Sequence, residues 1–101
     1  MILYNVTVNI DYAVHEEWLE WMKREHIPEV MATGLFTEPR MLRLMGDTEP
    51  GGITYSIQYL CKSMEDLQRY QSEHAPGLQA KHTQRYKDKF TAFRTVLEVV
   101  K

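Results

Sequence analysis

A short motif that occurs twice restricts the fold of this 101-residue chain more than any other feature. Residues 19–28 read Leu-Glu-Trp-Met-Lys-Arg-Glu-His-Ile-Pro, and residues 67–76 read Leu-Gln-Arg-Tyr-Gln-Ser-Glu-His-Ala-Pro. The two segments agree at Leu, Glu, His and Pro. The strand-like segment after each also begins alike, with Phe-Thr-x-x-Arg at residues 36–40 and at residues 90–94.

Two matches in the same order predict a duplicated unit. The chain length suits a single domain, so we expect one domain over residues 1–101, with an internal repeat of roughly residues 1–46 and 52–101. Each match is short, and chance alone could produce either of them.

Hydropathy patterning places the secondary structure. Apolar and polar residues alternate with a period of two over residues 2–10, which is typical of a strand. From Asp11, a plausible N-cap, the spacing becomes helical and ends near Gly34. Ser63 begins a second helix with an apolar stripe that runs through His74 to Leu78. The remaining segments are expected to be strands 36–45, 53–61 and 90–100, with a hairpin turn over 46–52.

The resulting order β-α-β-β-α-β predicts an α+β, ferredoxin-like domain, in which a four-stranded antiparallel sheet carries two helices on one face. The second face of the two central strands is uncharged and hydrogen-bonding, unlike a sheet face open to water. Its residues are Asn5, Thr7, Asn9, Thr54, Ser56 and Gln58. The simplest cover is the same face of another copy, which predicts a homodimer. A monomer with a neutral, solvated face is the alternative.

Composition narrows the partners. Twelve basic and fourteen acidic side chains give a formal charge of −2, so no positive field is available to gather nucleic acid. The single cysteine, Cys61, excludes an internal disulfide, and no leader-like or membrane-spanning apolar run is present. A cytoplasmic protein without a membrane partner is expected.

His26 and His74 are the candidate functional residues, because each stands two residues before a proline, late in a helix. The proline removes a helical hydrogen bond, so each helix is expected to kink or restart beside its histidine and open a cleft. His26 is the candidate general acid or base. Both histidines could instead be core residues that bond to the backbone or to a tyrosine, and His74, in mid-stripe, favours this structural role.

Other side chains are expected to line the same cleft. The candidate ligand contacts are Trp18, Met22, His74, Tyr55 and Tyr59. The tyrosines alternate into the apolar face of the sheet, so they are core residues first. Arg40 and Arg94, on the outer strands, could bind a carboxylate or phosphate, but edge strands also carry such charges to prevent aggregation.

No metal site is predicted, because His74 and His82 lie eight residues apart, roughly 12 Å along a helix, too far to share one ion. No serine elbow, glycine-rich phosphate loop or zinc motif occurs either.

Tryptophan, histidine and proline recur at fixed spacings, as Trp18-x-x-Trp21-x-x-x-x-His26-x-Pro28 and His74-x-Pro76. With these spacings the chain resembles the dimeric α+β barrel superfamily. Over essentially its whole length it is most similar to a bacterial family, domain of unknown function 4286. The stretches that carry this likeness are Tyr4-Asn5-Val6-Thr7, His26-Ile27-Pro28 and Ala92-Phe93-Arg94-Thr95.

The resemblance implies a ligand cleft between helices and sheet, since superfamily members include cofactor-independent or haem-using monooxygenases, decarboxylases, isomerases and mutarotases. Some carry a histidine that His26 would match. No cofactor is predicted, although haem is not excluded. Two functions remain open: an enzyme that acts on a compact, partly apolar ligand with His26 as acid or base, and a non-catalytic binding or dimerisation module. An RNA-binding role is disfavoured, because the free sheet face lacks stacking aromatics.

Overall fold

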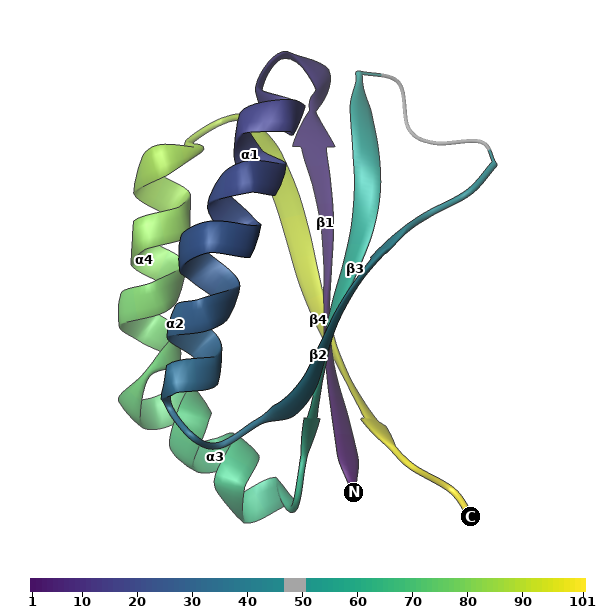
Figure 1. Ribbon diagram of the computed structural model, residues 1–101, viewed down its shortest axis with the longest axis vertical. Coiled ribbons are helices and arrows are strands. Elements are labelled where there is room, and N and C mark those ends of the chain that lie inside the picture. The colour runs from purple at the N-terminus through teal and green to yellow at the C-terminus, as the bar shows by residue number, and fades with distance from the viewer. Residues whose placement is uncertain (47–50) are drawn as a thin grey trace.

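The computed structural model describes residues 1–46 and 51–101, and it contains one four-stranded antiparallel sheet with the helices on a single face (Figure 1). The strand order is β2-β3-β1-β4. The elements are β1 (Ile2–Asp11), the 3-10 turn η1 (Tyr12–Val14), α1 (His15–Trp21), the π-helix η2 (Met22–His26), α2 (Ile27–Ala32), β2 (Thr37–Arg43), β3 (Gly52–Cys61), α3 (Met64–Glu73), α4 (Ala75–Arg85) and β4 (Phe90–Glu98). This confirms the predicted ferredoxin-like α+β fold.

The strand predictions are accurate in the centre of the sheet and too long at its edges. β1 and β3 pair over their full lengths, with Tyr4 opposite Tyr59. β2 ends at Arg43 and β4 at Glu98, two residues earlier than expected in each case. Of the predicted turn over 46–52, residues 47–50 lie outside the described residues.

The first helical segment is not uniform. α1 passes into η2, where the N–H of Ile27 donates to the carbonyl of Met22, five residues back, and α2 then continues the same direction. Pro28 stands in the first turn of α2, where a missing N–H is tolerated. The predicted irregularity beside His26 is therefore present, as a π-bulge. Gly34 ends the segment at φ +77°, a conformation that glycine adopts without strain.

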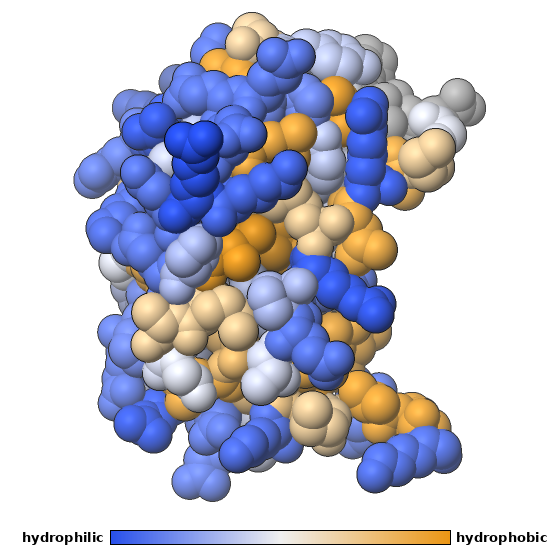
Figure 2. Space-filling view, in the orientation of Figure 1, coloured by the Kyte–Doolittle hydropathy of each residue, from blue (hydrophilic) through white to orange (hydrophobic). Residues whose placement is uncertain are grey.

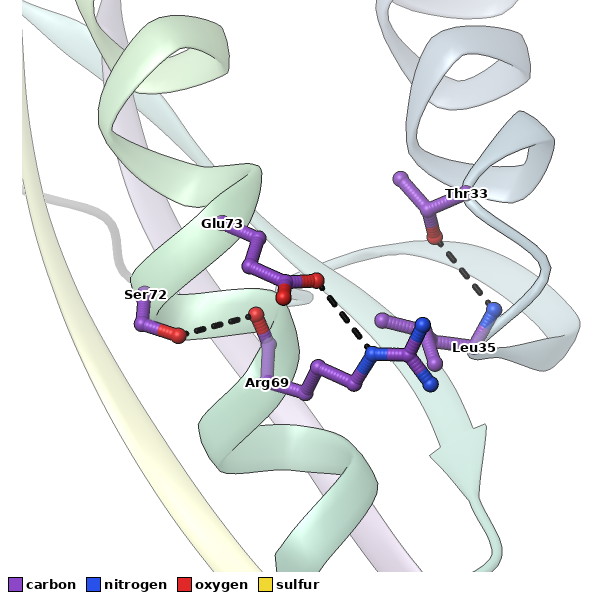
Figure 3. Close-up of polar contacts among 5 residues, drawn as sticks. All are labelled: Thr33, Leu35, Arg69, Ser72 and Glu73. Atoms are coloured by element: carbon purple, nitrogen blue, oxygen red, sulfur yellow. Dashed lines mark hydrogen bonds and ion pairs between the residues drawn. The ribbon is translucent and has the colours of Figure 1, made fainter.

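The second helical segment breaks completely. Ser63 caps α3 by accepting a hydrogen bond from the N–H of Asp66, as expected. His74 then leaves helical geometry at φ −121°, and α4 begins at the next residue. Figure 3 shows the ion pair of Arg69 with Glu73, at 3.2 Å, on the last turn before this break. The restart expected beside His74 is therefore present, and of the predicted stripe Leu67 and Tyr70 are buried while His74 and Leu78 are half-buried.

The core lies between the helices and the sheet. Trp18 and Leu67 are fully buried against it, and Tyr4, Tyr55 and Tyr59 are each at most 5% exposed, which confirms their assignment to the core. Within the described residues, no helix is long and apolar enough to cross a membrane.

The opposite face of the sheet carries a hydrogen-bonded polar network. Asn5 donates to Thr7 at 3.0 Å and accepts from Ser56, and Gln58 donates to Ser56 at 3.2 Å. Exposed apolar side chains surround the network. They include Leu42, Phe93 and Leu97. Figure 2 shows apolar surface on the side of the molecule away from the helices, near the end of β4.

Candidate ligand site

A cavity of about 250 Å³ opens between the helices and the inner face of the sheet. Its walls come from η2, α2, α3 and α4 on one side and from β1, β3 and β4 on the other. The lining residues are Tyr4, Val6, Val8, Met22, His26, Val30, Ile57, Tyr59, Tyr70, Gln79, His82, Thr83, Phe90, Thr91, Ala92 and Arg94. A volume slightly below the range of about 300–1,000 Å³ usual for ligand pockets suits a compact molecule.

His82 is the most buried histidine of the cavity, at 8% exposed. Its Nε2 accepts a hydrogen bond from the indole N–H of Trp18 at 2.9 Å. An indole nitrogen can only donate, so Nε2 carries no proton and the neutral ring has its proton on Nδ1. Burial, together with smaller effects of the nearby His26 and Arg94, lowers the pKa of His82 to about 4. His82 is therefore a neutral hydrogen-bond donor at pH 7.

His26 lies beside it, with the two ring centres 5.8 Å apart, and stacks on Trp21 at 5.1 Å. Burial lowers the pKa of His26 to about 4, while the carboxylate of Glu29 acts in the opposite direction. Among the described residues, no side chain or backbone group forms a hydrogen bond with its ring. His26 therefore keeps a nitrogen lone pair that is free to accept a proton.

Three tyrosines add neutral hydroxyl groups to the cavity. Burial raises the pKa of Tyr4, Tyr59 and Tyr70, so all three stay protonated at neutral pH. Aromatic packing fixes their rings: Tyr4 stacks on Phe36 at 5.8 Å, and Tyr70 meets Phe36 edge to face at 4.7 Å. The hydroxyls are thus held as donors on a rigid wall.

The structure brings together three of the predicted site residues, His26, Met22 and Tyr59, on the cavity wall. Trp18 and Tyr55 are buried behind it. Trp18 reaches the cavity only through its bond to His82, and Tyr55 packs on Trp18 at 5.2 Å and bonds to His15.

His74 is separated from these residues. It lines a shallow surface hollow that also contains Glu29, Glu73 and Lys81. It is half-buried, and its ring packs beside that of Tyr70 at 6.3 Å. The two predicted histidines therefore do not share a site.

Sequence reasoning missed His82 and Tyr70 as cavity residues. It considered His82 only as a metal partner of His74, because the pairing of His82 with Trp18 joins residues 64 positions apart and leaves no local pattern. Within the described part of the chain, no three His, Cys, Asp or Glu residues are grouped so as to hold a metal ion.

Comparison with solved structures defines the class of protein. An MhuD mutant crystallised with two manganese protoporphyrin IX molecules per active site has 20% identity and a TM-score of 0.71, covering 99% of this chain and 95% of that one. A dimeric ferredoxin-like protein from an uncultured marine organism has 12% identity and a TM-score of 0.71, covering 100% and 96%. SnoaB, a cofactor-independent oxygenase from Streptomyces nogalater, has 10% identity and a TM-score of 0.64, covering 99% and 94%. These likenesses show the ferredoxin-like α+β fold.

The sequence also assigns a family. The family described as Domain of unknown function (DUF4286) matches residues 1–100, and the chain belongs to it. A search of curated proteins found no match.

The MhuD structure raises the question of whether the cavity fits a porphyrin. Its volume of about 250 Å³ lies below the usual range for drug-sized ligands, and a porphyrin is larger than these. The Nε2 atom of His82 is already bonded to Trp18 and offers no ligand to iron, whereas His26 on the same wall has a free ring nitrogen. Haem therefore stays not excluded, as expected from the sequence, and no step of the proposed function depends on it.

Proposed function

We propose that this protein binds a compact, partly apolar small molecule in the cavity and transfers a proton to or from it, with His26 as the acid or base. The observation that carries the proposal is the pair of histidines in one enclosed space, His82 held as a donor and His26 with a free lone pair. Opposite roles of this kind are what general acid–base chemistry needs.

The surroundings of His26 support this role. The π-bulge places it at an irregular point of the helix, a feature often found at functional sites. Apolar side chains such as Val8, Ile57 and Phe90 form part of the cavity wall and would contact the carbon skeleton of a ligand.

Proton exchange in a compact carbon acid tests the proposal. In D₂O, wild-type protein should speed the exchange of the C2 protons of 1-phenylbutane-1,3-dione above the buffer rate, measured by proton NMR. His26→Ala should lose most of the acceleration, by about 10²-fold or more if a general base is removed. His74→Ala, which alters the matching histidine outside the cavity, should keep the wild-type rate. Equal rates in wild type and His26→Ala would contradict an acid–base role, and binding of the dione without exchange would favour the non-catalytic module.

We also propose that two copies associate through the polar face of the sheet. The hydrogen-bonded network around Asn5 and Ser56 lies beside the exposed apolar side chains of Phe93 and Leu97. Exposed apolar side chains grouped in this way are typical of protein–protein interfaces. The structural neighbour described as a dimeric ferredoxin-like protein supports self-association.

Light scattering at micromolar concentration should then report twice the chain mass of 12.0 kDa. Thr7→Lys, opposite Phe93 on this face, should yield monomers because it would bury a charge. Gln68→Lys, on the exposed surface of α3, should leave the mass unchanged. A wild-type monomer, or an intact Thr7→Lys dimer, would refute this interface.

A further inference from the structure

We propose that the ligand is an anion, a carboxylate or an ionised enol attached to a compact apolar group, and that Arg94 recognises it. This inference rests on the proposed small-molecule function of the cavity and adds the chemical class of its ligand.

The first argument is the charge balance of the lining. Among the described residues that line the cavity, Arg94 is the one that carries a formal charge at pH 7, since these residues include no aspartate or glutamate and their histidines are neutral. Arg94 lines the cavity and is itself exposed to solvent, so its guanidinium is open to an incoming anion. The described residues of the wall supply no carboxylate that would compete for it.

The second argument is that Arg94 has no acidic partner among the described residues, because its side-chain hydrogen bond is to the neutral hydroxyl of Tyr4. Within the described residues, Arg24, Arg69 and Arg85 each form an ion pair with a glutamate at 3.1–3.2 Å, whereas Arg94 forms none. Arg40, its counterpart on β2, also lacks an ion pair, but it does not line the cavity. Arg94 is thus the guanidinium left free to form a bidentate pair with an incoming carboxylate.

The third argument concerns the neutral polar groups. The Nδ1–H of His82 is a donor, because Trp18 occupies the other ring nitrogen, and the hydroxyls of Tyr4, Tyr59 and Tyr70 are protonated. A wall of donors beside a cation complements an oxyanion. Apolar residues of β1 and β3, such as Val8 and Ile57, would contact the rest of the ligand.

The charge of Arg94 reaches into the cavity. It acts to lower the pKa values of Tyr4, Tyr70, His26 and His82 alike. An anion paired with Arg94 would cancel this influence and raise the pKa of His26. Ligand binding would then make His26 a stronger base, which connects recognition to the proposed proton transfer.

A matched pair of probes tests the inference. Phenylacetate and phenylacetamide have nearly the same shape and differ in charge, and their binding to the full chain at pH 7 can be measured by titration with ¹H–¹⁵N NMR. We expect phenylacetate to bind at least about tenfold more tightly. Arg94→Met should abolish this preference while the amide binds as before, and Arg40→Met, the control, should retain it.

The outcomes separate the two proposals. Equal binding of both probes at the cavity, or a preference that survives in Arg94→Met, would overturn the anion inference and leave the proposed function standing. Failure of both probes to shift the resonances of cavity residues such as Val8 and Ile57, together with the absence of exchange in the dione, would overturn both. The spectra of Arg94→Met also report whether the variant is folded, so a loss of binding through unfolding would be recognised.

Discussion

The two Glu-His-x-Pro segments have nearly the same sequence and different structures. At the first segment, a π-bulge over Met22–His26 precedes Pro28, and the helix continues beyond it. At the second, His74 leaves helical geometry, and α4 starts anew at Ala75. Proline thus disturbs the helix at both sites, and packing around it decides how.

The histidines also meet different neighbours. His26 is enclosed by Trp21 and by His82, which comes from the other half of the chain. His74 lies in an open hollow among charged side chains such as Glu73 and Lys81. The shared motif therefore interrupts the regular helix at both places, but only His26 is brought next to a histidine of the other half of the chain.

Acidification gives the largest expected effect on stability, through the two cavity histidines His26 and His82. The pKa of His26 and that of His82 are lowered from 6.5 to about 4 in the folded state, so the unfolded chain takes up protons first as pH falls. The stability they contribute is complete above about pH 6.5 and is lost between about pH 6.5 and 4. The expected loss is on the order of 3 kcal/mol for each histidine.

Chemical denaturation from pH 7.5 to pH 4 measures this loss. His26→Gln should reduce the pH dependence over that window by about half, because His82 with its lowered pKa remains. Variants are compared at each pH because carboxylates also titrate near the lower end. An unchanged pH dependence in His26→Gln would contradict the lowered pKa of His26.

Much of the fold could be predicted because its determinants are local. Alternation over residues 2–10 and the cap at Ser63 depend on neighbours in the sequence, and both are present. The edge strands were predicted too long because apolar residues near their ends, such as Val99 and Val100, were counted as strand residues. In the structure these side chains are exposed and lie beyond the end of the strand. The restart of the second helical segment beside His74 was also predictable, because Pro76 stands two residues further on.

The candidate site could be predicted only in part. His26 and Met22 reach the cavity from one helical segment with local signals, and the structure places both on its wall. His82 needed a partner 64 residues away, which no local pattern reveals. The internal repeat, from which two equivalent histidines were expected, stays a prediction. A repeat compares each half with the other and does not predict which residues of the two halves are in contact.

Removing the hydrogen bond between Trp18 and His82 should lower the free energy of unfolding by an intermediate amount. Trp18→Phe removes the N–H donor and leaves the buried Nε2 of His82 without a partner, at a cost of about 1–3 kcal/mol beyond the loss of side-chain volume. Trp21→Phe is the matched control, because Trp21 is also buried and forms no hydrogen bond through its indole among the described residues. Urea unfolding at pH 7.5 should show Trp18→Phe to be the less stable variant. Equal stability would mean that the bond does not hold His82.

Replacing His74 should have the smallest effect, which reverses the expectation from the sequence alone. A mid-stripe core histidine would lose about 1–3 kcal/mol on substitution, because its buried partner would be left unsatisfied. The structure shows a half-buried ring that forms no hydrogen bond within the described residues and only packs beside Tyr70. His74→Ala should therefore change the free energy of unfolding by less than about 1 kcal/mol, near the range of surface substitutions. Urea unfolding of His74→Ala and wild type at pH 7.5, where histidine protonation contributes little, measures this directly. A loss above 2 kcal/mol would show that the break at Ala75 depends on the His74 side chain, and the two histidine sites would then be structurally alike.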